Sequence, residues 1–524
     1  MFGLLLAAAG VRLAFADPGT ISGPDRQTTI TLNYTRHTWW LSQRSNKWVV
    51  CQFAVEHDGQ PTEGEIYALC GTEVYEGWLD SVPCPDDGSE TCPGLLLNWV
   101  GSTTGQRTIE VDLPPPQVWI SLTDCEPPAS GQGCRNLPNL MLRGREPLPN
   151  HSIIGVRGLA DEAPFACDES DCSVPIPRRP DDEAVRVRFW AESSFGDTSQ
   201  VFEALLRVRE PRLTDKDQVG WQVDILSTQW RGDPSQSCAI AWESFPPGDD
   251  LPEWLTTPSN AEELASEVPY VFLAGVLIAR GEVDASGCPD GGLMENGVAN
   301  ACGVEKAQSM VEAWQNRFDG LILEAARGTG VPARLIKNLF ARESQFWPAI
   351  FNSRDETGLG QLTEGGTDTV LLWNADFFGE FCPLVFPEAT CAPGYALRAP
   401  GERAMLRGAV HNRIDATCDE CDLGIDLSKA DFSVRFFAET LVANCHQVGQ
   451  VVRNVTRRTA GEVASYVDLW RLTLANYHSG PGCLGEAVAS AWRYLPPLLW
   501  EDVKESFSEA CESGPIYVEA VGRP

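Results

Sequence analysis

Eighteen cysteines restrict how this 524-residue chain can fold, because many of them stand close together in the sequence. Close cysteine pairs in a secreted protein are typical of disulfides that clip local loops. Cys418 and Cys421 also have a spacing that suits two zinc ligands, but no second pair with that spacing stands nearby. We therefore favour disulfides over a metal site. The close pairs are Cys84/Cys92, Cys125/Cys134, Cys167/Cys172, Cys382/Cys391 and Cys418/Cys421, and the other eight cysteines can pair over longer distances.

The N-terminus favours export. Residues 2–9 form an apolar run, and Ala14-Phe15-Ala16 gives the small-x-small pattern of a signal-peptide cleavage site. The other long apolar run, Val268–Ala279, is too short to span a bilayer and indicates a buried segment. We expect a signal peptide over residues 1–16, no membrane span after its removal, and a protein that is secreted or held in the extracytoplasmic cell envelope.

Length and charge limit the organisation and the partners of the chain. A chain of this length is too long for one hydrophobic core and should divide into roughly two to four domains. Its 73 acidic and 40 basic residues give a net charge of −33. Such a surface repels phosphate backbones and anionic lipid headgroups, so we expect neither nucleic acid nor a membrane surface as a partner.

Residues 17–138 favour a β-rich module with one helix. Thr28–Asn33 and Trp48–Val55 are β-branched or alternating runs that are typical of strands. Thr62 and Glu65 have the spacing of a capping box, which predicts a helix that begins there and continues to Trp78. A disulfide between Cys51 and Cys70 would tie this helix to the preceding strand.

Residues 139–245 predict an immunoglobulin-like β-sandwich, because short strands recur at even spacing with turn residues between them. A stretch rich in Pro and Asp, Phe245–Leu255, then precedes mostly helical sequence, and residues 246–303 are expected to be a linker or connecting segment. The expected strands are Leu140–Arg143, Ser152–Arg157, Val185–Ala191, Val201–Val208, Trp221–Ser227 and Cys238–Trp242. The expected helices beyond the linker are Val304–Arg317, Phe318–Arg327, Pro332–Glu343, Phe432–Cys445, Gly461–His478 and Cys483–Tyr494.

The helix predicted over Pro332–Glu343 carries the strongest candidate for a chemical function. Proline suits the first turn of a helix. Glu343 follows Phe340 by three residues and Leu339 by four, so its carboxyl group belongs to the apolar face of the helix. Loss of hydration disfavours the charged carboxylate and raises its pKa toward that of a usable proton donor. The apolar stripe consists of Leu335, Ile336, Leu339 and Phe340.

Two further motifs follow this helix. In Gly358-Leu359-Gly360-Gln361-Leu362-Thr363 the glycines let the backbone run close to a ligand, and Gln361 offers both a hydrogen-bond donor and an acceptor. The second motif, Ala475-Asn476-Tyr477-His478-Ser479-Gly480-Pro481-Gly482, ends a helical run with a glycine-proline stop.

The three motifs, in this order, resemble the soluble lytic transglycosylase domain of the goose-type lysozyme superfamily. The pattern of that family is Glu-Ser, then Gly-Leu-Met-Gln-Leu, then Ala-Tyr-Asn-Ala-Gly-Pro-Gly, and the resemblance covers roughly the last 200 residues, on the scale of one domain. It implies a mainly α lysozyme-like domain there. Together with the N-terminal β-rich modules that the strand patterns predict, one of them immunoglobulin-like, the chain is expected to be a multidomain protein. The lysozyme-like domain would span residues 304–512, with a cysteine-rich insertion at 364–424, and a tail would follow at 513–524.

The resemblance also implies an activity that needs no cofactor. Its substrate would be the glycan strands of peptidoglycan, cleaved at the β-1,4 bond between N-acetylmuramic acid and N-acetylglucosamine. Glu343 would protonate the bridging oxygen and then take the proton from the C6 hydroxyl to close a 1,6-anhydro ring, while the acetamido group of the substrate supports the developing positive charge. The implied substrate-binding residues are Ser344, Gly358, Leu359, Gln361, Tyr477 and His478.

Two features depart from the family pattern. His478 stands where the family has Asn, and Leu495–Trp500 stands where a Glu-Thr-x-x-Tyr-Val segment is expected after Trp492. The alternatives are a hydrolytic lysozyme in which Asp355 or Glu356 activates water, a catalytically inactive protein that binds cell-wall glycan, and a wall-opening factor for a secretion or conjugation apparatus. For residues 139–245 we favour a structural spacer over a glycan-binding module.

Overall fold

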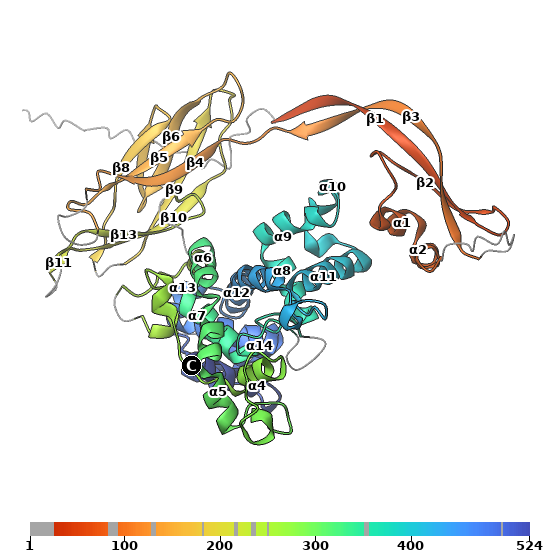
Figure 1. The fold of residues 1–524 in the computed structure, drawn as a ribbon. Helices are drawn as coiled ribbons and strands as arrows, with labels where there is room; N and C mark the ends of the chain where they lie inside the picture. Colours follow the sequence, from red (N-terminus) through yellow and green to blue (C-terminus); the bar gives the residue numbers. More distant parts are fainter. Residues whose placement is uncertain are drawn as a thin grey trace, which may run out of the picture.

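The computed structural model describes residues 26–81, 93–126, 133–180, 183–213, 218–231, 237–248, 251–349, 356–493 and 496–523. The expected signal peptide, the Cys84/Cys92 pair and Asp355 lie outside these residues. Antiparallel sheets make up the N-terminal part, and a mainly helical region follows them (Figure 1). Across the described ranges, no helix is both long enough and apolar enough to cross a membrane.

A three-stranded antiparallel sheet with the order β2-β1-β3 opens the described chain. β1 (Gln27–Gln43) and β3 (Leu95–Asp112) pair over their whole lengths and form a long two-stranded ribbon (Figure 1). β2 (Val49–Val55) pairs only with the C-terminal half of β1. The buried residues of this module lie where all three strands are present. Two helices, described next, pack against the sheet there.

The helical part of this module differs from the expectation. The capping box of Thr62 and Glu65 is present, and the disulfide between Cys51 and Cys70 ties the first helix to β2. Instead of one helix there are two, α1 (Glu63–Cys70) and α2 (Thr72–Leu79). Gly71 separates them with a φ of 84°, a backbone conformation that glycine adopts without steric cost.

Two antiparallel sheets then pack around a shared core. One has the strand order β13-β10-β9-β6-β7 and the other β4-β5-β8, and buried side chains of both sheets belong to one hydrophobic cluster. A short pair, β11 (Arg212–Leu213) and β12 (Gln218–Val219), lies outside them. The bounds are β4 Gln117–Thr123, β5 Asn139–Arg145, β6 Ile153–Ala160, β7 Ala163–Cys167, β8 Asp171–Pro175, β9 Val185–Ser193, β10 Phe202–Arg209 and β13 Gln222–Leu226.

Two boundaries of this region differ from those expected. β4 lies within the residues assigned to the first module, yet it pairs with β5 along its whole length, so the double-sheet region begins near Gln117 and not at residue 139. The segment Cys238–Trp242, expected as a strand, belongs to helix α3 (Ser237–Trp242). All five residues of this segment are apolar, and a short continuous apolar run fits a strand or one buried helical turn equally well.

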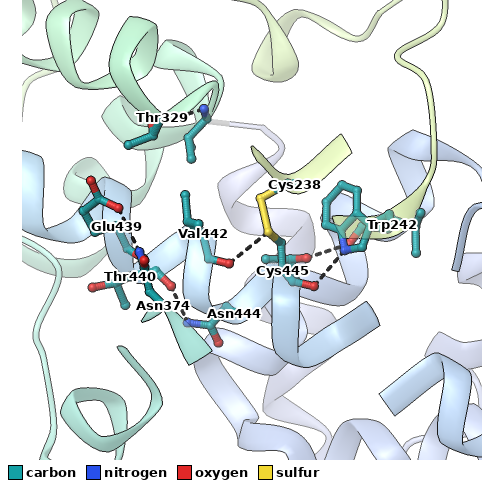
Figure 2. The surroundings of a disulfide bond; sticks show 12 residues. Cys238, Trp242, Thr329, Asn374, Glu439, Thr440, Val442, Asn444 and Cys445 are labelled. Atoms are coloured by element: carbon teal, nitrogen blue, oxygen red, sulfur yellow. Dashed lines mark hydrogen bonds between the residues drawn. A yellow bond between two sulfur atoms is a disulfide. The ribbon is translucent and has the colours of Figure 1, made fainter. Parts of the chain in front are cut away.

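A long-range disulfide fixes α3 to the helical region. Cys238 is bonded to Cys445, and the Trp242 indole nitrogen donates a hydrogen bond of 2.8 Å to the Cys445 carbonyl oxygen (Figure 2). Cys445 lies on α12 (Leu427–Thr456), the longest helix of the described chain. α12 packs against α3, α6, α8 and α14, so it forms the centre of the helical region.

The helices expected at Val304–Arg317, Phe318–Arg327 and Pro332–Glu343 are present as α5, α6 and α7. The helix expected at Phe432–Cys445 is part of α12, which extends well beyond both of these residues. The expected helix Gly461–His478 is divided between the short α13 and the first part of α14. The expected helix Cys483–Tyr494 forms the second part of α14, which is interrupted at Gly480, where φ is 78°. The bounds are α4 Val271–Ala279, α5 Ala301–Asn316, α6 Asp319–Thr329, α7 Ala333–Ser344, α8 Glu364–Trp373, α9 Ala375–Phe381, α10 Glu388–Cys391, α11 Pro400–Ile414, α13 Ala460–Val463, α14 Tyr466–Ala491, α15 Trp500–Lys504 and α16 Ser513–Val521.

Two segments expected to be connections are parts of the helical core. The expected linker, residues 246–303, contains α4, whose Leu273 and Leu277 are fully buried. The Gln345 side-chain oxygen accepts hydrogen bonds from the first amides of α4, which attaches this helix to the end of α7. The expected tail, residues 513–524, contains α16, which packs on α7 and α14. Both segments contain buried residues because they contact elements distant in sequence.

The disulfide interpretation of the close cysteine pairs is confirmed within the described residues. Cys418 and Cys421, the pair with zinc-like spacing, are bonded to each other. The expected insertion at 364–424 contains α8 to α11 and two of the disulfides. The bonds not yet named are Cys125–Cys134, Cys167–Cys172, Cys288–Cys302, Cys382–Cys391 and Cys483–Cys511.

Candidate active site

Glu343 lies in the last turn of α7, on the face that the helix buries. The four residues of the predicted apolar stripe are all fully buried, so the helical spacing places the Glu343 carboxyl group at the edge of the core, as expected. The helix ends immediately afterwards, because Gln345 and Phe346 both have a positive φ, of 47° and 64°. The chain therefore turns away and leaves the Glu343 side chain facing a cavity of about 420 Å³.

The surroundings of Glu343 favour its protonated form. Loss of hydration is the main cause, and with the negative charge of Glu356 it raises the pKa of Glu343 to about 7, although Tyr517 and Arg342 act in the opposite direction. The Tyr517 hydroxyl donates a hydrogen bond to Glu343 Oε1. A carboxyl group with this pKa is present in both protonation states near neutral pH, so it can donate a proton and later accept one.

Tyr517 is the main residue that the sequence analysis missed. It lies on α16, is almost fully buried, and stacks on the ring of His478 with the centroids 4.4 Å apart. Burial and the charge of Glu343 hold the pKa of Tyr517 well above its ordinary value, so the hydroxyl group remains a donor. The sequence analysis did not find it, because Glu512–Val518 differs from the expected Glu-Thr-x-x-Tyr-Val pattern by Ser513 in place of Thr and by one additional residue.

The Gly358–Thr363 loop lies against α12 and α14. A Cβ atom on Gly360 would come within 2.4 Å of Phe437 Cδ1 and 2.8 Å of the Tyr477 hydroxyl oxygen, so only glycine fits. Tyr477 also donates a hydrogen bond to the Gly360 carbonyl oxygen. Gly358 and Leu359 are buried and do not line the cavity. In the structure, the close approach at Gly360 is to protein side chains.

Ser344 also has a different role from the one expected. Its side chain is fully buried, and its hydroxyl group donates a 2.7 Å hydrogen bond to the Leu359 carbonyl oxygen. Ser344 therefore attaches the Gly358–Thr363 loop to the end of α7 and does not reach the cavity.

The remaining predicted residues do line the cavity. Gln361, Tyr477 and His478 are brought together with Glu343 from three separate elements. Gln361 adopts a φ of 52°, and its side-chain nitrogen donates to the Gly358 carbonyl oxygen, so the amide is held in one orientation. His478 is exposed at the rim; its contact with Tyr517 covers one ring face, and partial burial lowers its pKa and favours the neutral imidazole.

The back wall of the cavity is polar, which the sequence analysis did not foresee. Thr440 and Asn444 of α12 and Asn476 of α14 line it. The Asn476 side-chain nitrogen donates 2.7 Å hydrogen bonds to the side-chain oxygens of Asn444 and Gln447. The available signal was the occurrence of Asn444 and Gln447 three residues apart, which places both polar side chains on one face of α12.

The cavity contains a second carboxyl group. It belongs to Glu356, one of the two residues considered as a base for hydrolysis, which lines the cavity. Within the described ranges, no cluster of three or more His, Cys, Asp or Glu side chains has the arrangement of a metal site. The arrangement therefore provides one carboxyl group with a raised pKa, one further carboxyl group, and a polar wall.

Comparison with known proteins adds no further information on this site, since no protein-family model, curated protein or solved structure matches the chain.

Proposed function

We propose that the protein is a peptidoglycan lytic transglycosylase in which Glu343 acts as the general acid and then as the general base. The observation that carries this proposal is the raised pKa of Glu343 in an open cavity, next to a buried tyrosine that donates to one of its oxygens. The three sequence motifs support the choice of substrate, because Glu343, Gln361 and Tyr477 from those motifs line one cavity.

In the proposed reaction each residue has a separate task. Protonated Glu343 donates its proton to the glycosidic oxygen, the bond between this oxygen and C1 breaks, and the departing sugar leaves with a hydroxyl group. The acetamido group of the substrate supports the positive charge that develops at C1. The resulting carboxylate then accepts the proton of the C6 hydroxyl group, and the C6 oxygen bonds to C1 to close the 1,6-anhydro ring. Tyr517 orients the carboxyl group, and Tyr477 and Ser344 hold the loop that carries Gln361.

A hydrolytic muramidase is the second candidate, because Glu356 lines the same cavity and could activate a water molecule. The two reactions give different products. Transglycosylation releases 1,6-anhydro fragments that are lighter by one water than the fragments with a reducing end that hydrolysis releases. Mass spectrometry of the fragments released from purified peptidoglycan therefore distinguishes the two functions.

Two variants complete this test. Glu343→Gln should lower the release of fragments by at least about 10²-fold, because general acid–base catalysis contributes about 10²- to 10⁴-fold. Glu356→Gln should leave anhydro products in place if the protein is a transglycosylase and should abolish turnover if Glu356 activates water. Unchanged activity of Glu343→Gln would exclude the proposed mechanism, and binding of peptidoglycan without release of fragments by the native protein would indicate a glycan-binding protein.

A further inference from the structure

The base of the Gly358–Thr363 loop lies between two cavities. Glu356, two residues before the loop, lines the cavity that contains Glu343. The next residue, Thr357, lines a second cavity of about 400 Å³, and His411 of α11 belongs to the lining of that second cavity only. α11 is part of the insertion expected at 364–424. The insertion therefore reaches the base of this loop from outside the Glu343 cavity.

His411 makes a hydrogen bond through each of its ring nitrogens. Nδ1 lies 2.9 Å from the Thr357 hydroxyl oxygen, and Nε2 lies 3.0 Å from the hydroxyl oxygen of Thr367 on α8. The Thr367 hydroxyl group donates its only proton to the Thr363 carbonyl oxygen. Toward His411 it can therefore only accept, so Nε2 carries the ring proton and Nδ1 accepts from Thr357. The imidazole thus connects the residue before the loop with the last residue of the loop.

The neutral imidazole is the form that this pair of bonds requires. Burial lowers the pKa of His411, the charges of Glu364 and Asp415 act in the opposite direction, and the charge of Arg407 lowers it again. With a pKa below its ordinary value, the ring is neutral near pH 7, where Glu343 titrates. Any change of activity with pH near neutrality therefore reports Glu343 and not His411.

We infer that His411 is a positioning residue for the reaction, and that it holds Glu356 beside Glu343 through its hydrogen bond to Thr357. This inference rests on the proposed function and assigns it a residue outside the Glu343 cavity. The position of Glu356 matters because its negative charge helps to raise the pKa of Glu343. Without the bond to His411, Thr357 and Glu356 are free to move together away from Glu343. His411 thus adjusts the proton donor without touching it.

The test is the pH profile of fragment release by the full-length His411→Phe protein, which keeps a flat ring without nitrogen atoms. The alkaline limit of activity should move to lower pH, because Glu343 loses part of the repulsion that favours its protonated form. At pH 7 the rate should fall about three- to tenfold, on the scale of one lost hydrogen bond. His411→Asn, which keeps an acceptor near the place of Nδ1, should restore part of the native profile.

Two further variants show whether the effect passes through Glu356. On the background of Glu356→Gln, which has no charge to position, His411→Phe should not move the alkaline limit any further. Asn412→Ala is the matched control and should leave the profile unchanged, because Asn412 is an exposed neighbour on α11 that lines the same second cavity. An additional shift on the Glu356→Gln background, or an equal shift in Asn412→Ala, overturns the inference.

The other outcomes separate a positioning role from a structural one. An alkaline limit of His411→Phe that coincides with the native limit overturns the inference even if the Tm falls, because His411 then only stabilises the fold. If circular dichroism shows that His411→Phe does not fold, Thr357→Val, which removes the hydroxyl group at the other end of the bond, replaces it with the same expected shift.

A native protein that releases no fragments would refute the proposed function, and the inference is then decided by unfolding. The pKa of Glu343 is raised from 4.5 to about 7 in the folded protein, so the native protein should lose stability relative to Glu343→Gln as the pH rises between these values. This loss should be smaller when both proteins also carry His411→Phe. An equal loss with and without His411→Phe overturns the inference.

Discussion

The pKa of Glu343 results from opposing contributions of individual neighbours. Burial raises it to about 7, and the Tyr517 hydroxyl group partly counteracts this, because a hydrogen bond to a carboxylate stabilises the charged form. Since the first proposed step needs the protonated acid, activity should fall as the pH rises through about 7. Glu343 therefore sets the alkaline limit of activity, and Tyr517 adjusts that limit.

Tyr517→Phe should move this limit to higher pH. The substitution removes the donor but keeps the ring on His478, so the pKa of Glu343 should rise further, by roughly one unit for a lost hydrogen bond to a charged group. The measurement is the pH profile of fragment release. Tyr395→Phe is the control, because Tyr395 is also buried and donates to a carboxylate, that of Asp368, but does not line the cavity. A profile of Tyr517→Phe that coincides with the native one would contradict this account.

Among the elements, the Gly358–Thr363 loop connects the parts of the site. Ser344 holds it to α7, and Tyr477 of α14 donates to the carbonyl oxygen of Gly360. Phe437 of α12, which is fully buried, lies against the same glycine. The position of Gln361 in the cavity therefore depends on contacts of the loop with three helices, α7, α12 and α14.

Gly360→Ala should destabilise the protein and lower its activity together. The added methyl group would overlap the Phe437 ring and the Tyr477 hydroxyl group, and overpacking of a well-packed site costs about 1–3 kcal/mol. Gly320→Ala in α6 is the control, since a Cβ there meets no atom within 4 Å and alanine favours a helix. Thermal unfolding and fragment release would be measured for both variants. A Gly360→Ala protein as stable and active as the Gly320→Ala protein would show that the loop can move without consequence.

On the scale of the whole molecule, one covalent bond joins the end of the sheet region to the centre of the helical region. Cys238 and Cys445 are separated by 207 residues, and both are buried. Asn444, which lines the cavity, directly precedes Cys445 on α12, so the disulfide is attached to the same helix that contributes to the cavity lining (Figure 2). A disulfide that closes so long a loop lowers the conformational entropy of the unfolded chain more than a disulfide that closes a short loop does.

Replacing this disulfide should therefore lower stability more than replacing a short one. We expect the double substitution Cys238→Ala with Cys445→Ala to cost about 2–5 kcal/mol and to lower the Tm of the helical region in calorimetry. The comparison is Cys418→Ala with Cys421→Ala, a pair separated by only three residues. An equal or larger loss from the short pair would show that the long disulfide is not a main source of stability.

The sequence by itself determined the local features of this protein. The spacing of apolar residues in α7 was sufficient to place Glu343 on a buried face, because helical periodicity depends only on neighbours along the chain. The capping box, the close disulfides and the break at Gly480 were predictable for the same reason. The order of β-rich and helical regions also followed from such local patterns.

Only the tertiary structure decided what surrounds Glu343. Tyr517 reaches it from 174 residues away, and Ser344 is turned away from the cavity by a loop carbonyl oxygen 15 residues distant. The same holds for the pairing of β4 with β5 and for the burial of α4 and α16. Each of these contacts joins segments whose own sequences are compatible with several partners, and the partner is chosen by how all the elements pack together.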